Sequence, residues 1–340
     1  MKLVYTREEL FRSHDYARPQ IEAGHRIHGG FLADGSYVPP RSLVRGEAIA
    51  AWTHALRERG GDLLPADASL RAGVRYPSPA QQKLLLLEGL GQTFWNALTI
   101  VGVIEARGRA LADLTFPELQ DALLEDVSSM AIGHLNRGLF ETHGIDEGGE
   151  PARGIGGHDV MWFAVRDLAF GETDFPAPLV PESITRPETP APRIPGIPRA
   201  FERMVDFLCN LLMIELRAER IFSTTETLLR DPELFTDRRA EAMHGAEIVN
   251  RIRTDEAIHV RSLRLYLGEL RELSFRTRGG GRLAGRDVVD PLWQGVVQWA
   301  THEQPKLAAE QQRRLLAERI ARHPEASRVQ AAFDALEEAA

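Results

Sequence analysis

Two side chains within an apolar helical pattern have the right chemistry and spacing to bind a metal ion. Glu256 and His259 stand three residues apart in the stretch RTDEAIHVRS. Side chains at positions i and i+3 share one face of a helix, and that face is otherwise apolar, with Ile252 and Leu263. Carboxylates and imidazoles are both metal ligands. The pattern therefore predicts that the pair points into the core.

Three other segments with helical periodicity also place an acid or an imidazole on an apolar face. Burying an unpaired carboxylate costs on the order of several kcal/mol, so acids that converge from four helices require protons or a cation. Helical bundles build di-metal sites in this way, with one Glu from each of two helices and Glu-x-x-His from each of the other two. The residues are Glu105 in 78–114, His134 in a helix predicted over 115–144, and Glu215 and Glu219 in 199–230.

The stretch DEAIH, residues 255–259, resembles the Asp-Glu-x-x-His motif on the fourth helix of the ferritin-like diiron-carboxylate proteins. The resemblance implies that Glu256 and His259 are metal ligands. It also implies that Asp255 bonds the ring of the opposite histidine, His134, since a ligating histidine needs a carboxylate on its other nitrogen.

The resemblance extends over about residues 90–270 and implies that Glu105 and Glu215 are the ligands from the first and third helices. The predicted second helix departs from the family, because MAIGH has Ala131 where a bridging glutamate is expected and only His134 remains. Candidates to replace the missing carboxylate are Glu219, Glu141 and Asp126.

The order of helical segments predicts an all-α protein built on a ferritin-like four-helix bundle with additional helices. The Gly-rich stretch 144–157 is expected to be a loop, and 158–171 a shorter helix. We expect a loop-rich N-terminal extension over 1–80, the bundle over 81–275 with a proline-rich crossover at about 172–198, and a C-terminal turn and helices over 276–340.

Composition and the N-terminal sequence favour a cytoplasmic protein. The net charge of −8 argues against a nucleic-acid partner. The single cysteine, Cys209, fits a reducing compartment. No apolar run approaches the ~20 residues of a membrane span, and the N-terminal MKLVYTREEL lacks a signal-peptide apolar region. No membrane partner is expected.

These residues favour an enzyme over other classes of protein. The resemblance implies a centre of two iron ions, or of manganese and iron, with O2 as co-substrate. Such a centre would hydroxylate, N-oxygenate or desaturate a small organic substrate, with electrons from an external donor. No catalytic residue beyond the metal centre is predicted. Bundles of this type often dimerise, and a homodimer is expected by analogy only.

Two alternatives stay open from the sequence. A ferroxidase or radical-generating relative would use the same ligands, and a radical protein needs a nearby tyrosine, for which Tyr266 shares the stripe of His259. A non-catalytic helical scaffold with a degenerate site is the other alternative, and Ala131 is its best support. The second Glu-x-x-His, Glu241–His244, lacks the preceding Asp and is expected to be structural.

Overall fold

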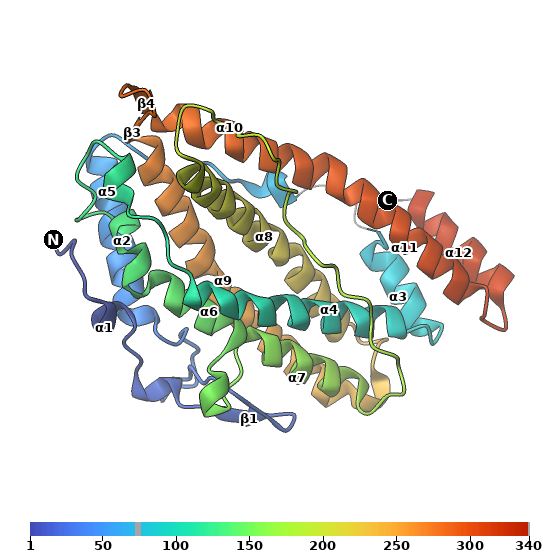
Figure 1. The fold of residues 1–340 in the computed structure, drawn as a ribbon. Coiled ribbons are helices and arrows are strands. Elements are labelled where there is room, and N and C mark those ends of the chain that lie inside the picture. Colours follow the sequence, from blue (N-terminus) through green and yellow to red (C-terminus); the bar gives the residue numbers. More distant parts are fainter. Residues whose placement is uncertain (72–75, 339–340) are drawn as a thin grey trace.

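A computed structural model describes residues 1–71 and 76–338 and shows a mostly helical protein, which confirms the all-α prediction (Figure 1). Its two longest helices, α8 (Arg199–Arg230) and α9 (Arg239–Arg271), are joined by a short connection and pack side by side. Asp231-Pro232 ends the first of them, because the residue before a proline disfavours the helical conformation.

Three shorter helices complete the part of the fold that surrounds the candidate site. These are α4 (Gln92–Gly108), α6 (Phe140–Gly148) and α7 (His158–Phe170). α7 packs on both α4 and α9, and α6 packs on α4 and α7. The predicted helix at 158–171 is thus confirmed. Residues 171–198 contain no helix or strand and form the long connection from α7 to α8.

The N-terminal residues cover one side of the bundle, where α2 packs on α9. A turn at Asp34–Gly35 lies within a bridge between Phe31 and Tyr37, and Gly35 has a positive φ. The elements before α4 are α1 (Arg7–Leu10), η1 (Asp15–Ala17), β1 (Gln20–Glu22), β2 (His25–Ile27), α2 (Ser42–Glu58), η2 (Ala68–Arg71) and α3 (Pro79–Leu87).

The C-terminal residues add a hairpin and further helices, as expected. α10 packs on α8 and α9, while α11 and α12 extend beyond them with α3 (Figure 1). None of the helices in the described residues is both long and apolar enough to cross a membrane. The elements are β3 (Ser274–Arg276), β4 (Arg282–Ala284), α10 (Gly285–Gln298), η8 (Trp299–Glu303), α11 (Gln304–Ile320) and α12 (Ala326–Glu338).

The prediction of a single helix over 115–144 is wrong. Gly138 has φ +98°, a left-handed conformation that interrupts a helix. Upstream, the buried carboxylate of Glu269 accepts the backbone N–H groups of Ala131 and Ile132, at 3.2 and 3.0 Å, and so holds this stretch in a tight turn. The elements here are η3 (Arg109–Asp113), α5 (Leu119–Ala122), η4 (Ala131–His134) and η5 (Leu135–Leu139), and α6 then continues into residues expected to be a loop.

We predict that Glu269 makes the protein less stable as the pH rises. Burial raises its pKa to about 7, although the N–H groups of Ile132 and Ala131 and the nearby Arg59 oppose the shift. The unfolded chain loses this proton near pH 4.5, so the stabilisation is complete below that pH and is lost as the pH rises through about 7. Relative to Glu269→Gln, the wild type should lose roughly 2–3 kcal/mol of unfolding free energy between pH 5 and pH 8.

Urea unfolding of metal-free protein at both pH values measures this difference. Glu272→Gln, at an exposed position three residues further along, is the control and should leave the pH profile of the wild type unchanged. Parallel profiles for the wild type and Glu269→Gln would contradict the prediction.

Candidate metal centre

Four glutamates and three histidines from five helices converge inside the bundle. Their potential ligand atoms form two groups, in each of which the atoms lie within 4.8 Å of one another. One group is His143, Glu147, Glu215 and His259, and the other is Glu105, Glu147, His158 and Glu256. We call these seven residues the Glu/His cluster. Because Glu147 belongs to both groups, the cluster could hold metal ions at two adjacent positions.

Glu147 occupies the centre of the cluster. Its Oε1 lies 3.1 Å from Nδ1 of His259, 3.5 Å from Nε2 of His143 and 3.8 Å from Nδ1 of His158. This oxygen and Nδ1 of His158 are buried, and none of the nearby polar atoms is aligned for a hydrogen bond with either of them. Buried polar atoms without a partner are rare in native proteins, so their convergence fits a site for a cation.

The remaining carboxylates complete the two groups. Oε1 of Glu215 lies 2.9 Å from Nε2 of His143. Glu256 uses both of its oxygens, one 3.0 Å from Nδ1 of His158 and the other 2.9 Å from Nδ1 of His259. Every histidine therefore directs one nitrogen at the carboxylates. Neutral imidazole nitrogens and carboxylate oxygens together suit first-row transition metals.

Glycines allow α6 to approach its neighbours closely enough to deliver its ligands. His143 and Glu147 are four residues apart and share a face of this helix. A Cβ at Gly144 would lie 2.3 Å from the backbone N of Ala112, and one at Gly108 of α4 would lie 2.8 Å from Cβ of Glu147. A side chain at Gly108 would push α6 away from α4, and one at Gly144 would push α6 away from the segment Arg109–Asp113 that follows α4.

The metal-free cluster favours a mixture of protonated acids and charged imidazoles. Burial, with the charges of Glu105 and Glu256, raises the pKa of Glu147 well above its usual value. Burial and Glu256 raise the pKa of Glu215 to about 7. Burial lowers the pKa of His259, but Glu256 and Asp146 outweigh it and raise the value to about 9. Metal ions would replace these protons, so binding should release them.

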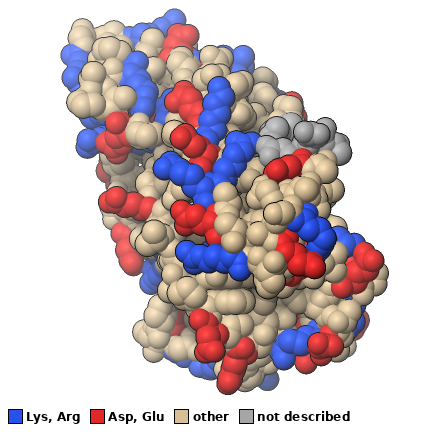
Figure 2. All heavy atoms as spheres, turned by 90° about the vertical axis from the view of Figure 1, so that its right-hand side faces the viewer, with Lys and Arg blue, Asp and Glu red and all other residues tan. Residues whose placement is uncertain are grey.

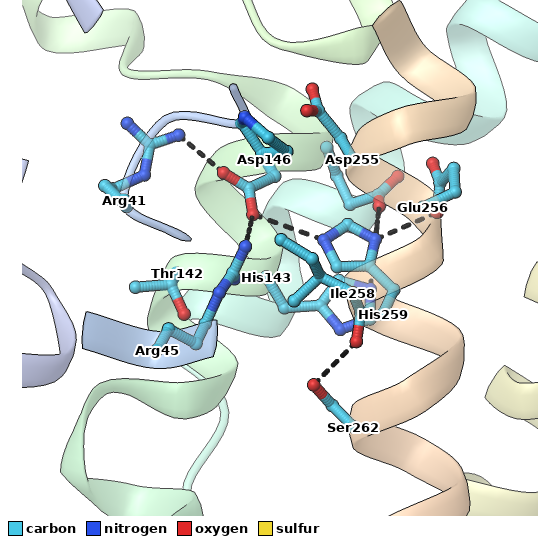
Figure 3. A network of polar contacts seen from close by, with 12 residues as sticks. Arg41, Arg45, Thr142, His143, Asp146, Asp255, Glu256, Ile258, His259 and Ser262 are labelled. Carbon is cyan, nitrogen blue, oxygen red and sulfur yellow. Dashed lines mark hydrogen bonds and ion pairs between the residues drawn. The ribbon is translucent and has the colours of Figure 1, made fainter. Parts of the chain in front are cut away.

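An ion-pair network holds the outer nitrogen of His259 (Figure 3). Nε2 lies 3.2 Å from Oδ2 of Asp146. Arg45 donates to this same oxygen at 2.7 Å, and Arg41 donates to Oδ1 at 2.6 Å. Burial raises the pKa of Asp146, but the two guanidiniums outweigh it and hold the pKa well below its usual range. Asp146 stays ionised, so it fixes the ring with Nδ1 directed at the cluster.

Asp255 fixes the ring of His158 in the same way. Its Oδ2 lies 3.1 Å from Nε2 of His158 and 3.3 Å from Nε2 of His28. The hydroxyl of Tyr37 donates to both carboxylate oxygens, at 2.8 and 2.9 Å. Burial raises the pKa of Asp255, yet His158 and His28 outweigh it and bring the pKa to about 2. Two of the three cluster histidines therefore have a carboxylate behind them, a common arrangement for metal ligands.

The structure brings together four of the five predicted ligands, which are Glu105, Glu215, Glu256 and His259. It does not bring His134 to them, and this placement has to be corrected. Nε2 of His134 accepts the N–H of Tyr5 at 3.1 Å, and Nδ1 donates to the carbonyl of Met130 at 2.7 Å. Both of its nitrogens are thus used by the backbone, because its segment forms a turn instead of a bundle helix. Asp255 accordingly bonds His158 and not His134.

The predicted additional ligands also lie elsewhere. Glu219 pairs with Arg253, and Glu141 forms an ion pair with Arg7 near the surface. Asp126 is exposed and bonds the Ser128 backbone. The second Glu-x-x-His behaves as expected, since His244 pairs with Glu22 outside the cluster.

Three cluster residues were not predicted from the sequence. These are His143, Glu147 and His158. A signal was present in HGIDE, residues 143–147, since its histidine and second acid are four apart and would share a helix face. The glycines in and after this stretch instead favoured a loop. His158 begins α7, where a capping role is the ordinary expectation.

We predict that Asp146→Asn strongly destabilises the metal-free protein. The amide cannot balance two buried guanidiniums, and breaking a buried ion pair costs about 3–5 kcal/mol. Because the folded-state pKa of Asp146 is lowered, its contribution is complete above the unfolded pKa and is lost only on acidification below it. Urea unfolding at pH 7 measures the loss.

Glu141→Gln is the matched control, because it removes an ion pair that is more exposed. Its cost should be at most about 1 kcal/mol. Equal stability of the two variants would contradict the prediction.

Comparison with known proteins gives no match: no family model, no curated protein and no solved structure matches this chain. The likeness to ferritin-like diiron-carboxylate proteins therefore stays a prediction from the motif at 255–259. Function has to be inferred from the geometry of the Glu/His cluster.

Proposed function

We propose that the Glu/His cluster holds two metal ions in a ferritin-like bundle, and that the protein is a non-haem diiron, or manganese–iron, oxidoreductase. The position of Glu147 carries this proposal. Its carboxylate belongs to both groups of ligand atoms, so it can bridge two ions. It would supply, from α6, the carboxylate that the sequence lacks at Ala131.

The charges of the cluster support two divalent ions. Four glutamates bring four negative charges when ionised, and two divalent cations would balance them. A single divalent ion would leave two buried charges without compensation, which burial strongly disfavours. In the metal-free cluster, the raised pKa values of Glu147 and Glu215 reflect the same cost of burying uncompensated negative charges.

The scaffold alternative predicts arginine partners for the buried acids, and the described residues do not provide them. In residues 1–71 and 76–338, no lysine or arginine nitrogen lies within 4.0 Å of a carboxylate oxygen of Glu105, Glu147, Glu215 or Glu256. The nearby arginines instead bind Asp146, outside the two groups. This arrangement favours a metal site over a decayed one.

Bound iron, or manganese with iron, would supply the electrons and Lewis acidity that reduction of O2 requires. The residues of the chain would bind the ions and shape the site around them. The four glutamates can bind through one or both oxygens, Asp146 and Asp255 would hold His259 and His158 in their ligating tautomers, and the surrounding core would exclude bulk water.

A small organic substrate and an external electron donor are the partners we propose, and a nucleic acid is not among them. The face in Figure 2 carries acidic and basic side chains side by side, without an extended basic surface. A homodimer is part of the proposal only by analogy with other bundles.

One observation supports the radical-generating alternative. Tyr37, and not the predicted Tyr266, is connected to the cluster, since its hydroxyl bonds Asp255 and Asp255 bonds His158. Tyr266 is buried against Phe140. A radical-forming relative would thus use Tyr37, with the same metal ligands.

Metal content tests the centre. Protein produced with iron and manganese both available should contain about two metal ions per chain by elemental analysis, one for each group of ligands. Glu147→Ala should lose most of both ions, because it removes a ligand from both groups. Glu241→Ala and Glu219→Gln should retain them, since neither residue is in the cluster. Circular dichroism checks that each variant is folded. Less than one ion per chain in folded wild type, or equal contents in all variants, would refute the centre.

Oxygen uptake tests the reaction class. Protein loaded with ferrous iron under anaerobic conditions should consume O2 on mixing, faster than the same concentration of free ferrous iron. The zinc-loaded protein is the control, because zinc has no redox chemistry. Uptake no faster than that of free iron would contradict an oxidoreductase while leaving the metal site intact.

A further inference from the structure

A cavity of about 360 Å³ lies between α4, α8 and the C-terminal helices. α8 contributes one face to it, with residues at the helical spacing of three and four. On the opposite side, Trp299 and Ala308 belong to the C-terminal segment that closes the cavity. The α8 residues are Asn210, Met213, Ile214, Arg217, Ala218, Arg220, Ile221 and Phe222.

This cavity meets the Glu/His cluster at Glu105. Glu105 lines the cavity together with its α4 neighbours Val101 and Ile104. It is also the one member of the cluster that is only partly buried, whereas the other six are at most 6% exposed. A molecule in the cavity would therefore reach the cluster from the side of Glu105.

A second cavity, of about 650 Å³, touches the cluster through Glu215 and Glu256. Both of these carboxylates are nearly covered, with 6% and 5% exposure. The rim of this cavity includes exposed residues such as Arg57 and Arg261. It gives a molecule less access to the cluster than the first cavity does.

Arg217 lines the first cavity beside Arg220 and places a positive charge against its largely apolar walls. Its Nη1 donates to Oε1 of Gln304 at 3.0 Å, and within residues 1–71 and 76–338 no carboxylate oxygen lies within ion-pair distance of it. Burial and the neighbouring Arg220 lower its pKa, but a guanidinium remains charged at neutral pH. A partly buried guanidinium without a carboxylate partner favours an anionic ligand.

We propose that this cavity binds a small organic carboxylate, with its acid group on Arg217 and its apolar body along Ile214 and Ile104 toward Glu105. The volume is within the range of small-molecule sites. The largely apolar walls would hold the body of the ligand, and Arg217, beside Arg220, would orient its acid group. The inference that this ligand is the substrate of the metal centre rests on the proposed function. The inference that the ligand binds in this cavity does not depend on that function.

Calorimetric titration of the full chain tests the site, with octanoate as the probe and octanol as its uncharged analogue. Octanoate should bind more tightly than octanol. Arg217→Gln should weaken octanoate binding at least about tenfold, because a hydrogen bond to a charged group is lost, and should leave octanol binding unchanged. Arg261→Gln, at the rim of the second cavity, is the matched control and should change neither.

Ala308→Trp provides a second variant, because added bulk in the wall of the cavity should block both probes without removing a charge. Octanoate that fails to bind wild-type protein, or that binds Arg217→Gln and Ala308→Trp as tightly as wild type, would overturn the proposal.

Titrations with and without bound metal separate this proposal from the function. Arg217-dependent binding to a protein that takes up no metal supports the carboxylate site and refutes the centre. A protein that holds two metal ions but binds octanoate no better than octanol retains the centre and refutes the carboxylate site.

Discussion

The carboxylate of Glu147, buried among three imidazole rings, is the feature on which the rest of the structure depends. A group of this kind is stable only if protons or cations balance it. The surrounding acids increase the cost of ionising this carboxylate, because Glu105 and Glu256 raise the pKa of Glu147 further. Among residues 1–71 and 76–338, no lysine or arginine forms an ion pair with Glu147, so the balancing positive charge has to come from protons or from metal ions.

The N-terminal residues are part of this balance and do more than cover the bundle. Arg41 and Arg45 hold Asp146 ionised behind His259, and Tyr37 bonds Asp255 behind His158. Each outer carboxylate thus orients a ring whose other nitrogen faces the cluster. Loss of this segment would release both rings, even though none of the seven cluster residues precedes Glu105.

Helical periodicity was enough to predict α4, α7, α8 and α9, and the ligands that interrupt the apolar faces of α4, α8 and α9. It failed at α6, where nine residues carry two ligands, His143 and Glu147. Glycine ordinarily weakens a helix, yet Gly144 is required by a contact with Ala112 that only the folded structure reveals. His134 had the expected residue type and spacing, but Glu269, distant in sequence, turns its segment away from a helix. Both errors come from long-range contacts, which local pattern does not contain.

The continuity of α8 connects the cluster to the cavity beside it. Glu215 faces the cluster, whereas Ile214, Arg217 and Ile221 face the cavity. In an α-helix each residue turns the chain by about 100°, so the two faces keep a constant relation only while the helix is uninterrupted. An inserted or deleted residue near Glu215 would rotate one face relative to the other. Continuous helix from Arg199 to Arg230 thus fixes where a carboxylate bound to Arg217 would lie relative to the metal ligands.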